Sequence, residues 1–282
     1  REEYVKPIEQ GKVPENEEGG PYRERRLERL RARLRPFVLR RTKELVAPEL
    51  PERQEQELRI ELSPAHRAVY DTVLQRERQK VLRLLTDLDS NRFIVFRSLT
   101  LLRMLALAPA LVDAGDTGIP SSKLDALRER LRELIAEGHR ALVFSQFTSY
   151  LDLVRADLDA HGIGYEYLDG STRRRADVID AFRRGDAPVF LISLKAGGFG
   201  LTLTEADYVF LMDPWWNPAA EAQAIDRTHR IGQTRPVNVY RMIAAGTIEE
   251  KVVALQQRKA RLFTAVLGEG DALAQSLTAD DI

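Results

Sequence analysis

The sequence lacks cysteine and has little tryptophan, methionine or histidine, with 0, 2, 3 and 4 of these residues among 282. The absence of cysteine excludes disulfides, thiolate metal sites and cysteine nucleophiles. No run of about 18 apolar residues occurs, so no membrane-spanning segment is predicted. Glycine and proline, at 17 and 13 residues, are too few for a collagenous or low-complexity chain. The composition is that of an ordinary globular protein whose chemistry relies on other side chains.

The sequence also lacks net charge, because 43 basic residues balance 43 acidic ones. The basic residues are nevertheless concentrated: residues 21–45 contain ten of them against three acidic residues. Most of the ten are arginine, whose planar guanidinium suits two-point contacts with phosphate or carboxylate. This segment is therefore a candidate anion-binding face. A solvated helix surface, or a brace that docks against DNA or another lobe, explains the same charges, and these alternatives stay open.

Helical periodicity dominates the first part of the chain. Leucines recur at three- and four-residue spacing over residues 22–36, where a proline interrupts the pattern. Residues 63–108 are predicted to be mainly helical, since Ser63 can cap a helix and Pro64 suits its first position. The dense apolar stretch over residues 93–107 predicts the buried second helix of a hairpin.

From residue 121 onward, helical and strand-like segments alternate. Five short apolar segments are predicted strands: residues 141–144, 165–168, 189–192, 208–212 and 237–240. Helices are expected between them, including one over residues 219–229. The alternation predicts an α/β fold with a mostly parallel sheet covered by helices on both faces. A Thr-x-x-Glu sequence at residues 247–250 has the form of a capping box and predicts a helix to about Leu267.

Polar or glycine-rich segments follow four of the predicted strands, at residues 145–146, 169–172, 193–200 and 213–218. In an open parallel sheet, ligands bind at the carboxyl ends of the strands, because loops and helix N-termini converge there. Ordinary turns gather at this edge as well. Four such segments at one edge nevertheless favour a shared binding surface.

The most distinctive segment, QAIDRTHRIGQ, runs from Gln223 to Gln233 and is predicted to lie on a helix and its exit turn. Arg227 and Arg230 are three residues apart and would share a helix face. Two guanidinium groups on one face neutralise charge that develops on a transferred phosphoryl group. A generic RTHR string is more often a solvated helix surface, so the wider pattern decides.

That segment resembles motif VI of the Swi2/Snf2 ATPases of helicase superfamily 2, whose pattern is Q-x-x-D-R-x-H-R-x-G-Q. Residues 142–147 resemble motif IV of the same family, residues 168–172 resemble motif IVa, and residues 193–204 resemble motif V. Residues 34–43 are similar to the family's linker into its second lobe. Together these segments cover roughly residues 23–262.

The resemblance implies the second of two RecA-like lobes, an α/β fold with a mostly parallel sheet, helices on both faces and a helical insertion subdomain. The expected organisation is a linker (1–22), a basic connecting segment into the second lobe (23–62), the helical insertion subdomain (63–119), the RecA-like helicase C-terminal lobe (120–246), a brace helix (247–268) and an acidic tail (269–282). The chain begins with Arg1 and has no apolar leader, so we expect a piece of a longer cytosolic polypeptide.

The resemblance also implies roles for individual residues. Catalytic arginine fingers are expected at Arg227 and Arg230, and nucleotide-binding residues at Gln223, Asp226, Gly198 and Gly200. DNA-binding residues are expected at Ser145, Gln146, Ser171, Thr172, Lys195 and Trp216, with no metal ligand among them. ATP and Mg²⁺ would be held mainly by the N-terminal lobe, since neither its G-x-x-x-x-G-K-[ST] loop nor its acidic D-E-x-H box occurs in this sequence. This fragment alone is therefore not expected to hydrolyse ATP.

Two positions depart from the family's pattern. Thr202 stands where asparagine is common, and residues 173–175 are three arginines where a proline and an acidic residue are usual, which favours stronger phosphate binding. Ser171 and Thr172 also suit a simple helix N-cap. Of the two tryptophans, Trp215 is expected to be structural and Trp216 to approach the DNA.

The expected partners are duplex DNA, the N-terminal RecA-like lobe of the same polypeptide and a DNA-bound protein load. An RNA helicase lobe, an RNA polymerase-associated remodeller and an ATPase-silent binding module are the alternatives. The glutamine that ends the motif, in place of an H-R-x-G-R ending, favours the DNA translocase. An arginine-, alanine- and leucine-rich composition without cysteine suggests a bacterial cytoplasm.

Overall fold

The computed structural model describes residues 19–34, 36, 47, 49–84, 88–194, 196 and 202–267. The chain divides into two units, residues 1–48 with 255–282 and residues 49–254, and each is described by itself. The first unit contains α2 (Gly19–Leu34), which corresponds to the predicted helix with regularly spaced leucines. The acidic tail over residues 269–282 and most of the predicted linker lie outside the described residues.

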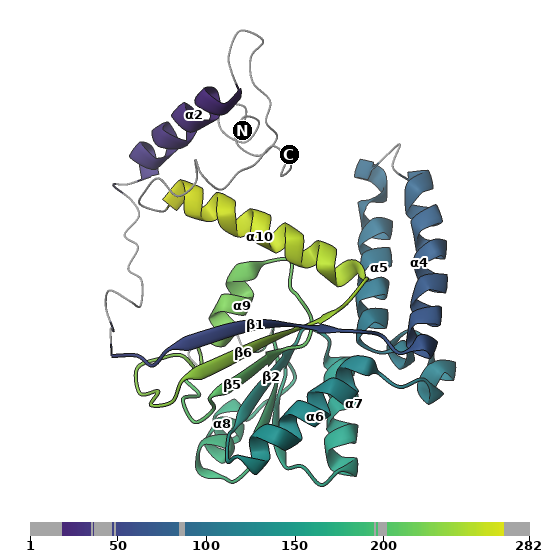
Figure 1. Cartoon of the computed structure of the whole chain (residues 1–282), viewed down its shortest axis with the longest axis vertical. Coiled ribbons are helices and arrows are strands. Elements are labelled where there is room, and N and C mark those ends of the chain that lie inside the picture. Colours follow the sequence, from purple (N-terminus) through teal and green to yellow (C-terminus); the bar gives the residue numbers. More distant parts are fainter. Residues whose placement is uncertain are drawn as a thin grey trace. The chain divides into compact units, whose positions relative to one another are not determined.

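A parallel sheet of six strands forms the centre of the second unit, within the described residues (Figure 1). The strands are β1 (Arg53–Ile60), β2 (Ala141–Ser145), β3 (Tyr165–Leu168), β4 (Val189–Ser193), β5 (Tyr208–Leu211) and β6 (Val237–Ala244). Their order across the sheet is β1-β6-β5-β2-β4-β3, and every neighbouring pair is parallel. The predicted α/β fold class is confirmed, and each of the five predicted strands is present.

Helices cover both faces of the sheet, as the alternation predicted. The helices α6 (Ser122–Ala136) and α7 (Thr148–Ala160) pack on one face, where Ala141 and Val143 of β2 point. The helices α8 (Arg175–Arg184) and α9 (Pro218–Ile225) pack on the other, with Leu142 and Phe144. Because successive side chains of a strand point to opposite faces, a strand between two helical layers has to be apolar throughout. All five residues of β2 are indeed buried.

Two long helices, α4 (Pro64–Leu84) and α5 (Leu88–Leu107), lie side by side as a hairpin (Figure 1). The predicted N-cap is present, because Ser63 Oγ accepts a hydrogen bond from the His66 N–H at 3.4 Å. Between the helices, the Ser98 hydroxyl donates to the Glu77 carboxylate at 2.6 Å. The short 3-10 helices η3 (Pro109–Leu111) and η4 (Ala114–Gly118) follow. The hairpin therefore has its own internal polar contact and leads directly into α6.

The edge strand β1 was missed by the sequence analysis, which predicted only a connecting segment there. Its sequence, RQEQELRI, has no apolar alternation, and its first five residues are exposed. The strand forms because its backbone pairs with β6 along eight residues, from Arg53 opposite Val237 to Ile60 opposite Ala244. Backbone pairing of this kind leaves no hydrophobic pattern by which it could have been predicted.

The helix α10 (Ile248–Leu267) has the predicted limits but a different cap. Thr247 Oγ1 accepts from the Glu249 N–H at 3.2 Å and donates to the Ala244 carbonyl at 2.8 Å. The carboxylate that folds back is that of Glu249, which accepts from the Ala244 N–H at 2.8 Å. The predicted partner was Glu250, so the capping box was wrong in this detail. No helix among the described residues is both long and apolar enough to cross a membrane.

Candidate functional site

Polar loops gather at the carboxyl edge of the sheet, on both sides of β2. Strands β4 and β3 lie on one side of β2, whereas β5, β6 and β1 lie on the other. The connection after β2 leads to β3 on one side, whereas the connection after the adjacent strand β5 leads to β6 on the other, so the chain leaves these two neighbouring strands in opposite directions. In parallel α/β sheets such a switch point is where ligands bind. The segments predicted to share a binding surface all leave from this edge.

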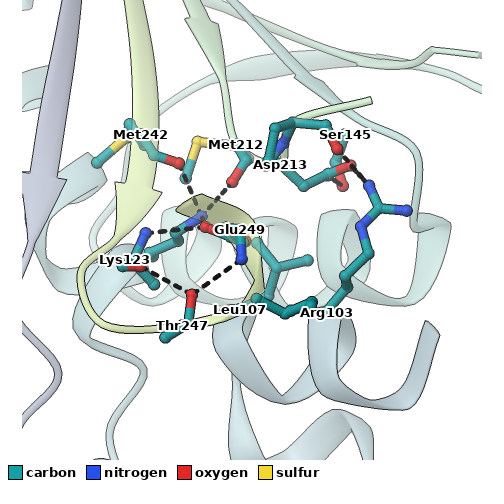
Figure 2. Close-up of polar contacts among 12 residues, drawn as sticks. Arg103, Leu107, Lys123, Ser145, Met212, Asp213, Met242, Thr247 and Glu249 are labelled. Carbon is teal, nitrogen blue, oxygen red and sulfur yellow. Dashed lines mark hydrogen bonds and ion pairs between the residues drawn. The ribbon is translucent and has the colours of Figure 1, made fainter. Parts of the chain in front are cut away.

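Asp213, shortly after β5, fixes the loop that follows β2 (Figure 2). Its Oδ2 accepts from the Ser145 hydroxyl at 2.5 Å and from the Gln146 N–H at 3.2 Å. Ser145 Oγ in turn accepts from the Phe147 N–H at 3.1 Å. Ser145 and Asp213 are completely buried. The Ser145 side chain therefore shapes the loop from inside, and a DNA contact by this side chain requires its hydroxyl to leave Asp213.

Gln146 and the two tryptophans lie closer to the surface of the same region. Gln146 is half-buried, and its amide Nε2 is buried without a hydrogen-bond partner among the described residues. Trp215 and Trp216 are also half-buried. The Trp215 N–H donates to Glu221 Oε1 at 2.7 Å. The Trp216 ring has its centroid 5.4 Å from the guanidinium carbon of Arg103, a cation–π distance.

A buried cluster centred on Lys123 adjoins this loop (Figure 2). Lys123 Nζ donates to the Met212 carbonyl at 2.6 Å, to the Met242 carbonyl at 2.7 Å and to Glu249 Oε2 at 2.5 Å. The side chains of Lys123 and Glu249 are 0% exposed. One ammonium group thus joins the start of α6, the residue after β5, the strand β6 and the start of α10.

Burial changes the pKa values of the charged groups in this region. It lowers the pKa of Lys123 and raises that of Glu249, and the charge of each partner opposes the shift. Burial also raises the pKa of Asp213 and lowers that of Arg103, again against the charge of the partner. An unpaired buried charge costs several kcal/mol. Each of these groups therefore depends on its partner to remain ionised inside the protein.

The loop after β3 is closed on itself by Asp169. Its Oδ1 accepts from the backbone N–H groups of Ser171 and Thr172 at 2.8 and 3.1 Å, and from their hydroxyls at 2.7 and 3.1 Å. Burial alone would raise the pKa of Asp169, but these hydrogen bonds and one from Tyr167 lower it overall. The N-cap residue of α8 is Arg174, without a side-chain cap. The helix N-cap considered for Ser171 and Thr172 is therefore wrong.

The three arginines after this loop are exposed. Arg174 pairs with Asp177 at 2.6 Å. Arg173 and Arg175 form no ion pair with any residue that the structure describes. The Ser171 and Thr172 donors are directed at Asp169, so the uncompensated positive charge of this loop resides mainly on Arg173 and Arg175.

The predicted helix over residues 219–229 ends four residues early, because α9 stops at Ile225. Tighter turns follow: the Arg227 N–H bonds to the Ala224 carbonyl at 3.3 Å, and the Arg227 carbonyl accepts from the Leu203 N–H at 2.9 Å. Arg227 and Arg230 therefore do not share a helix face, and that part of the prediction was wrong. They occupy different environments, with Arg227 5% exposed and Arg230 at the surface.

The two arginines differ in their contacts as well. Arg227 Nε is buried and has no hydrogen-bond partner among the described residues. Burial, together with the nearby charge of Arg230, lowers the pKa of Arg227. Arg230 Nη1 donates to Thr202 Oγ1 at 3.0 Å. Thr202, one of the two departures from the family's pattern, thus bonds to an arginine of the motif. The charge of Arg230 acts on Arg227, and two like charges that act on each other favour an anion between or beside them.

The remaining residues of the motif hold this turn in place. The Gln233 amide donates to the Ala206 carbonyl at 2.9 Å, and its oxygen accepts from the N–H groups of Thr234 and Arg235, each at 2.9 Å. His229 Nε2 lies 2.8 Å from the Pro51 carbonyl. Gln233 and His229 are buried, so their side chains act within the protein.

The contacts of Asp226 and Gln223 complete the geometry of the motif. Asp226 Oδ1 lies 3.9 Å from Arg53 Nη1, and Gln223 is exposed on α9. Arg53 begins β1, and Ala206 precedes β5, so the turn lies beside the amino ends of the strands. The predicted site residues therefore form two separate groups, one at the carboxyl edge and one at this turn.

Three predicted site residues, Lys195, Gly198 and Gly200, lie outside the described residues. Four buried residues at the carboxyl edge were not singled out by the sequence analysis: Arg103, Lys123, Asp213 and Glu249. Asp213 had a signal in its polar loop after a strand. Lys123 had a weaker one, as a single lysine among the leucines of a predicted amphipathic helix. Nothing in the local sequence marked Arg103 as the partner of Asp213 or Glu249 as the partner of Lys123.

The turn over residues 226–233, called the arginine turn because it carries Arg227 and Arg230, suits an anionic ligand. Its donors are guanidinium groups, which neutralise phosphate charge. No group of three or more histidine, aspartate or glutamate side chains that could hold a metal occurs in the described part of the chain. The chemistry of the turn therefore suits a phosphate group.

Two family models match the chain. The model described as "SNF2-related domain" matches residues 3–109, and the model described as "Helicase conserved C-terminal domain" matches residues 122–232. In fold, the chain is similar to the C-terminal part of the Fun30 ATPase domain, as seen in its crystal structure. The TM-score is 0.62 and the identity 23%, and the match covers 82% of this chain and 94% of that one. That likeness supports the RecA-like architecture of the sheet.

Curated relatives come from bacteria and eukaryotes. An "Uncharacterized ATP-dependent helicase" of Mycoplasma pneumoniae is 36% identical over 90% of this chain. The mouse "SWI/SNF-related matrix-associated actin-dependent regulator of chromatin subfamily A member 1" is 37% identical over 86% of it. The "DNA repair protein RAD5" of Cryptococcus neoformans is 49% identical over 57% of it. The chain spans only 24%, 24% and 14% of the length of these relatives, respectively.

Proposed function

Because the chain belongs to the Snf2 family of helicase superfamily 2, as the C-terminal region of such a protein, we propose that it is the second lobe of an ATP-dependent translocase on double-stranded DNA. In this proposal it supplies arginine fingers and contacts to the DNA backbone. It requires the N-terminal lobe of the same polypeptide for hydrolysis.

The separation of the two groups is the observation that carries the proposal. A translocase has to respond to nucleotide in one place and hold nucleic acid in another. The arginine turn lies beside the amino ends of the strands, held by Pro51 and Ala206. The loops of Gln146, Thr172 and Trp216 lie at the opposite, carboxyl edge. One rigid sheet between them supports mechanical coupling from hydrolysis to DNA.

Arg227 and Arg230 are proposed to act at the transferred phosphoryl group. Their positive charge would stabilise the negative charge that develops there, an effect that raises hydrolysis by about 10³ to 10⁵ for an arginine finger. Gln223 and Asp226 are proposed to orient the nucleotide, together with Gly198 and Gly200. The ATP and Mg²⁺ would be held mainly by the N-terminal lobe, so hydrolysis occurs only when the two lobes close.

The DNA grip is proposed at the carboxyl edge, through Gln146, Ser145, Trp216 and the loop of Ser171 and Thr172, with Lys195. Hydroxyls, amides and cations of this kind contact sugar and phosphate and fix position without reading bases. Sequence preference should therefore be weak. Arg173 and Arg175 would add two phosphate contacts, because they are exposed and form no ion pair with the described residues.

The names of the relatives support DNA as the substrate, since they include a DNA repair protein and a regulator of chromatin. We propose that translocation displaces a protein that is bound to the DNA. The Mycoplasma relative and the arginine-rich composition support a bacterial protein that acts on DNA of the cytoplasmic nucleoid.

ATP turnover by the complete parent polypeptide tests the proposal. Turnover is measured with duplex DNA, single-stranded DNA and RNA at equal nucleotide concentration. Duplex DNA should stimulate most, and Arg230→Ala should abolish the stimulated rate while duplex binding persists. Arg130→Ala, an exposed arginine on α6, is the matched control and should retain full turnover.

Other outcomes would replace the proposal by a named alternative. Stimulation mainly by RNA would assign the lobe to an RNA helicase or an RNA polymerase-associated remodeller. Duplex binding without any ATP turnover would make it part of an ATPase-silent binding module. Full turnover by Arg230→Ala would overturn the arginine finger but leave the DNA assignment in place.

A further inference from the structure

A single side chain, Arg103, connects the helical hairpin to the loop after β5 (Figure 2). Arg103 lies on α5, and its side chain is only 3% exposed. Its Nη2 donates to the Pro214 carbonyl and lies 3.7 Å from Asp213 Oδ1. One guanidinium nitrogen thus holds both the main chain and the carboxylate of the loop that carries Trp216.

The same carboxylate holds the loop after β2. Asp213 accepts from the Ser145 hydroxyl at 2.5 Å and from the Gln146 N–H at 3.2 Å. Through Asp213, Arg103 is therefore one hydrogen bond away from the main chain of Gln146. The two loops leave neighbouring strands, β2 and β5, and the carboxylate of Asp213, which belongs to the loop after β5, bonds to the loop after β2.

The guanidinium also packs against an aromatic ring of each loop. Its carbon lies 5.6 Å from the ring centroid of Phe147 and 5.4 Å from that of Trp216. Phe147 adjoins Gln146, so the guanidinium contacts an aromatic ring of both predicted DNA-contacting loops. A lysine in this place would keep the charge but lose the planar shape and the multiple donors of arginine.

We propose that Arg103 is a positioning residue of the DNA grip, which sets the Gln146 and Trp216 loops relative to each other and links the α4–α5 hairpin to them. The inference rests on the proposed function, because it gives those loops the duplex backbone as their ligand. Arg103 itself is buried and touches no DNA. Its effect should therefore be seen in how well duplex DNA engages the enzyme and should depend on the loop residues.

Arg103→Lys in the complete parent polypeptide tests the proposal without removing the buried positive charge. ATP turnover is measured against duplex concentration. The variant should need about tenfold more duplex DNA for half-maximal stimulation, because it loses the hydrogen bond from a charged donor to the Pro214 carbonyl and the planar contact with both aromatic rings. Glu77→Gln is the matched control: it weakens another buried polar contact of the same hairpin, with Ser98, and should respond to duplex DNA as wild type does.

A double-mutant cycle separates positioning from general loss of structure. If Arg103 acts through the loop of Trp216, Arg103→Lys should change the half-maximal duplex concentration by less than about twofold in a Trp216→Ala background. Independent effects that multiply would overturn the proposal, as would an equal shift in Glu77→Gln. If duplex DNA stimulates the wild type and Arg103→Lys responds to duplex DNA as the wild type does, only this inference is refuted. If duplex DNA does not stimulate the wild type, the proposed function itself is refuted.

Discussion

Replacing Lys123 by methionine should destabilise the sheet unit strongly. Methionine has a similar length but donates no hydrogen bond, so the Met212 and Met242 carbonyls and the Glu249 carboxylate all lose their shared donor. Both members of the ion pair are 0% exposed, so water cannot replace Lys123 in this structure. Removing one partner of a buried pair costs about 3–5 kcal/mol. We expect the free energy of unfolding of Lys123→Met to fall by that amount.

Urea denaturation of the chain, followed by tryptophan emission, measures this loss. The chain has two tryptophans, Trp215 and Trp216, and both belong to the unit that contains Lys123. The control is Arg130→Met on the same helix, whose ion pair with Glu133 is about half exposed, with side chains 52% and 55% exposed. Exposed pairs of this kind contribute about 0.5 kcal/mol or less.

A second substitution tests the cause of the loss. Glu249→Gln removes the charge that Lys123→Met leaves unpaired, so the double variant should be more stable than the sum of the two single losses by about 2 kcal/mol. A loss below about 1 kcal/mol for Lys123→Met, or strictly additive losses in the double variant, would refute the reasoning from burial.

Three further predictions concern the loop after β3, the stability of the protein at low pH and the arginine turn. Arg173→Ala with Arg175→Ala should reduce the salt dependence of duplex binding by about two units of slope, measured as log affinity against log salt, whereas Arg130→Ala should leave it unchanged. The pKa of Asp169 is lower in the folded protein than its ordinary value of 3.8, so its contribution to stability is complete above pH 3.8 and is lost as the pH falls through the folded pKa. Asp169→Asn should lack this loss of stability when acid denaturation is measured. Identical dependence of stability on pH in the variant and the wild type would contradict the assignment. Gln233→Leu should lower the free energy of unfolding by about 1–3 kcal/mol, because it leaves buried main-chain groups without partners; an unchanged urea midpoint would show that the turn does not depend on this amide.

The sequence predicted the sheet well because its signals are local. Strands β2 and β4 are buried on both faces, so each is an apolar run that stands out between polar segments. Gly138 and Gly162 lie just after the ends of α6 and α7, and both have left-handed φ angles, of 78° and 67°, a conformation that favours glycine. The polar strand β1 was missed since its pairing with β6 connects residues far apart in sequence.

The spacing of the family motif did not predict how its residues lie. Its spacing suggested a helix that carries both arginines on one face, whereas α9 ends at Ile225 and leaves Arg227 buried and Arg230 exposed. The contact of Leu203 with the Arg227 carbonyl, made across the fold, competes with continuation of the helix. Helix propensity alone cannot register such a contact.

The buried polar cluster was beyond the reach of sequence patterns. Lys123 and Glu249 are separated by 126 positions, and Arg103 and Asp213 by 110. A charged residue among leucines normally indicates the solvent side of a helix. The tertiary structure brings the carboxyl ends of β5 and β6 next to the start of α6, and this arrangement turns these charges inward.

Displacement of a third strand from duplex DNA tests the central claim most directly. A translocating enzyme removes a triplex-forming oligonucleotide from its path, whereas a static DNA-binding protein does not. The complete parent polypeptide should displace the oligonucleotide only with hydrolysable ATP. Arg230→Ala should bind the same duplex and displace nothing. Displacement by Arg230→Ala, or duplex-stimulated ATP turnover by wild type without displacement, would contradict the account.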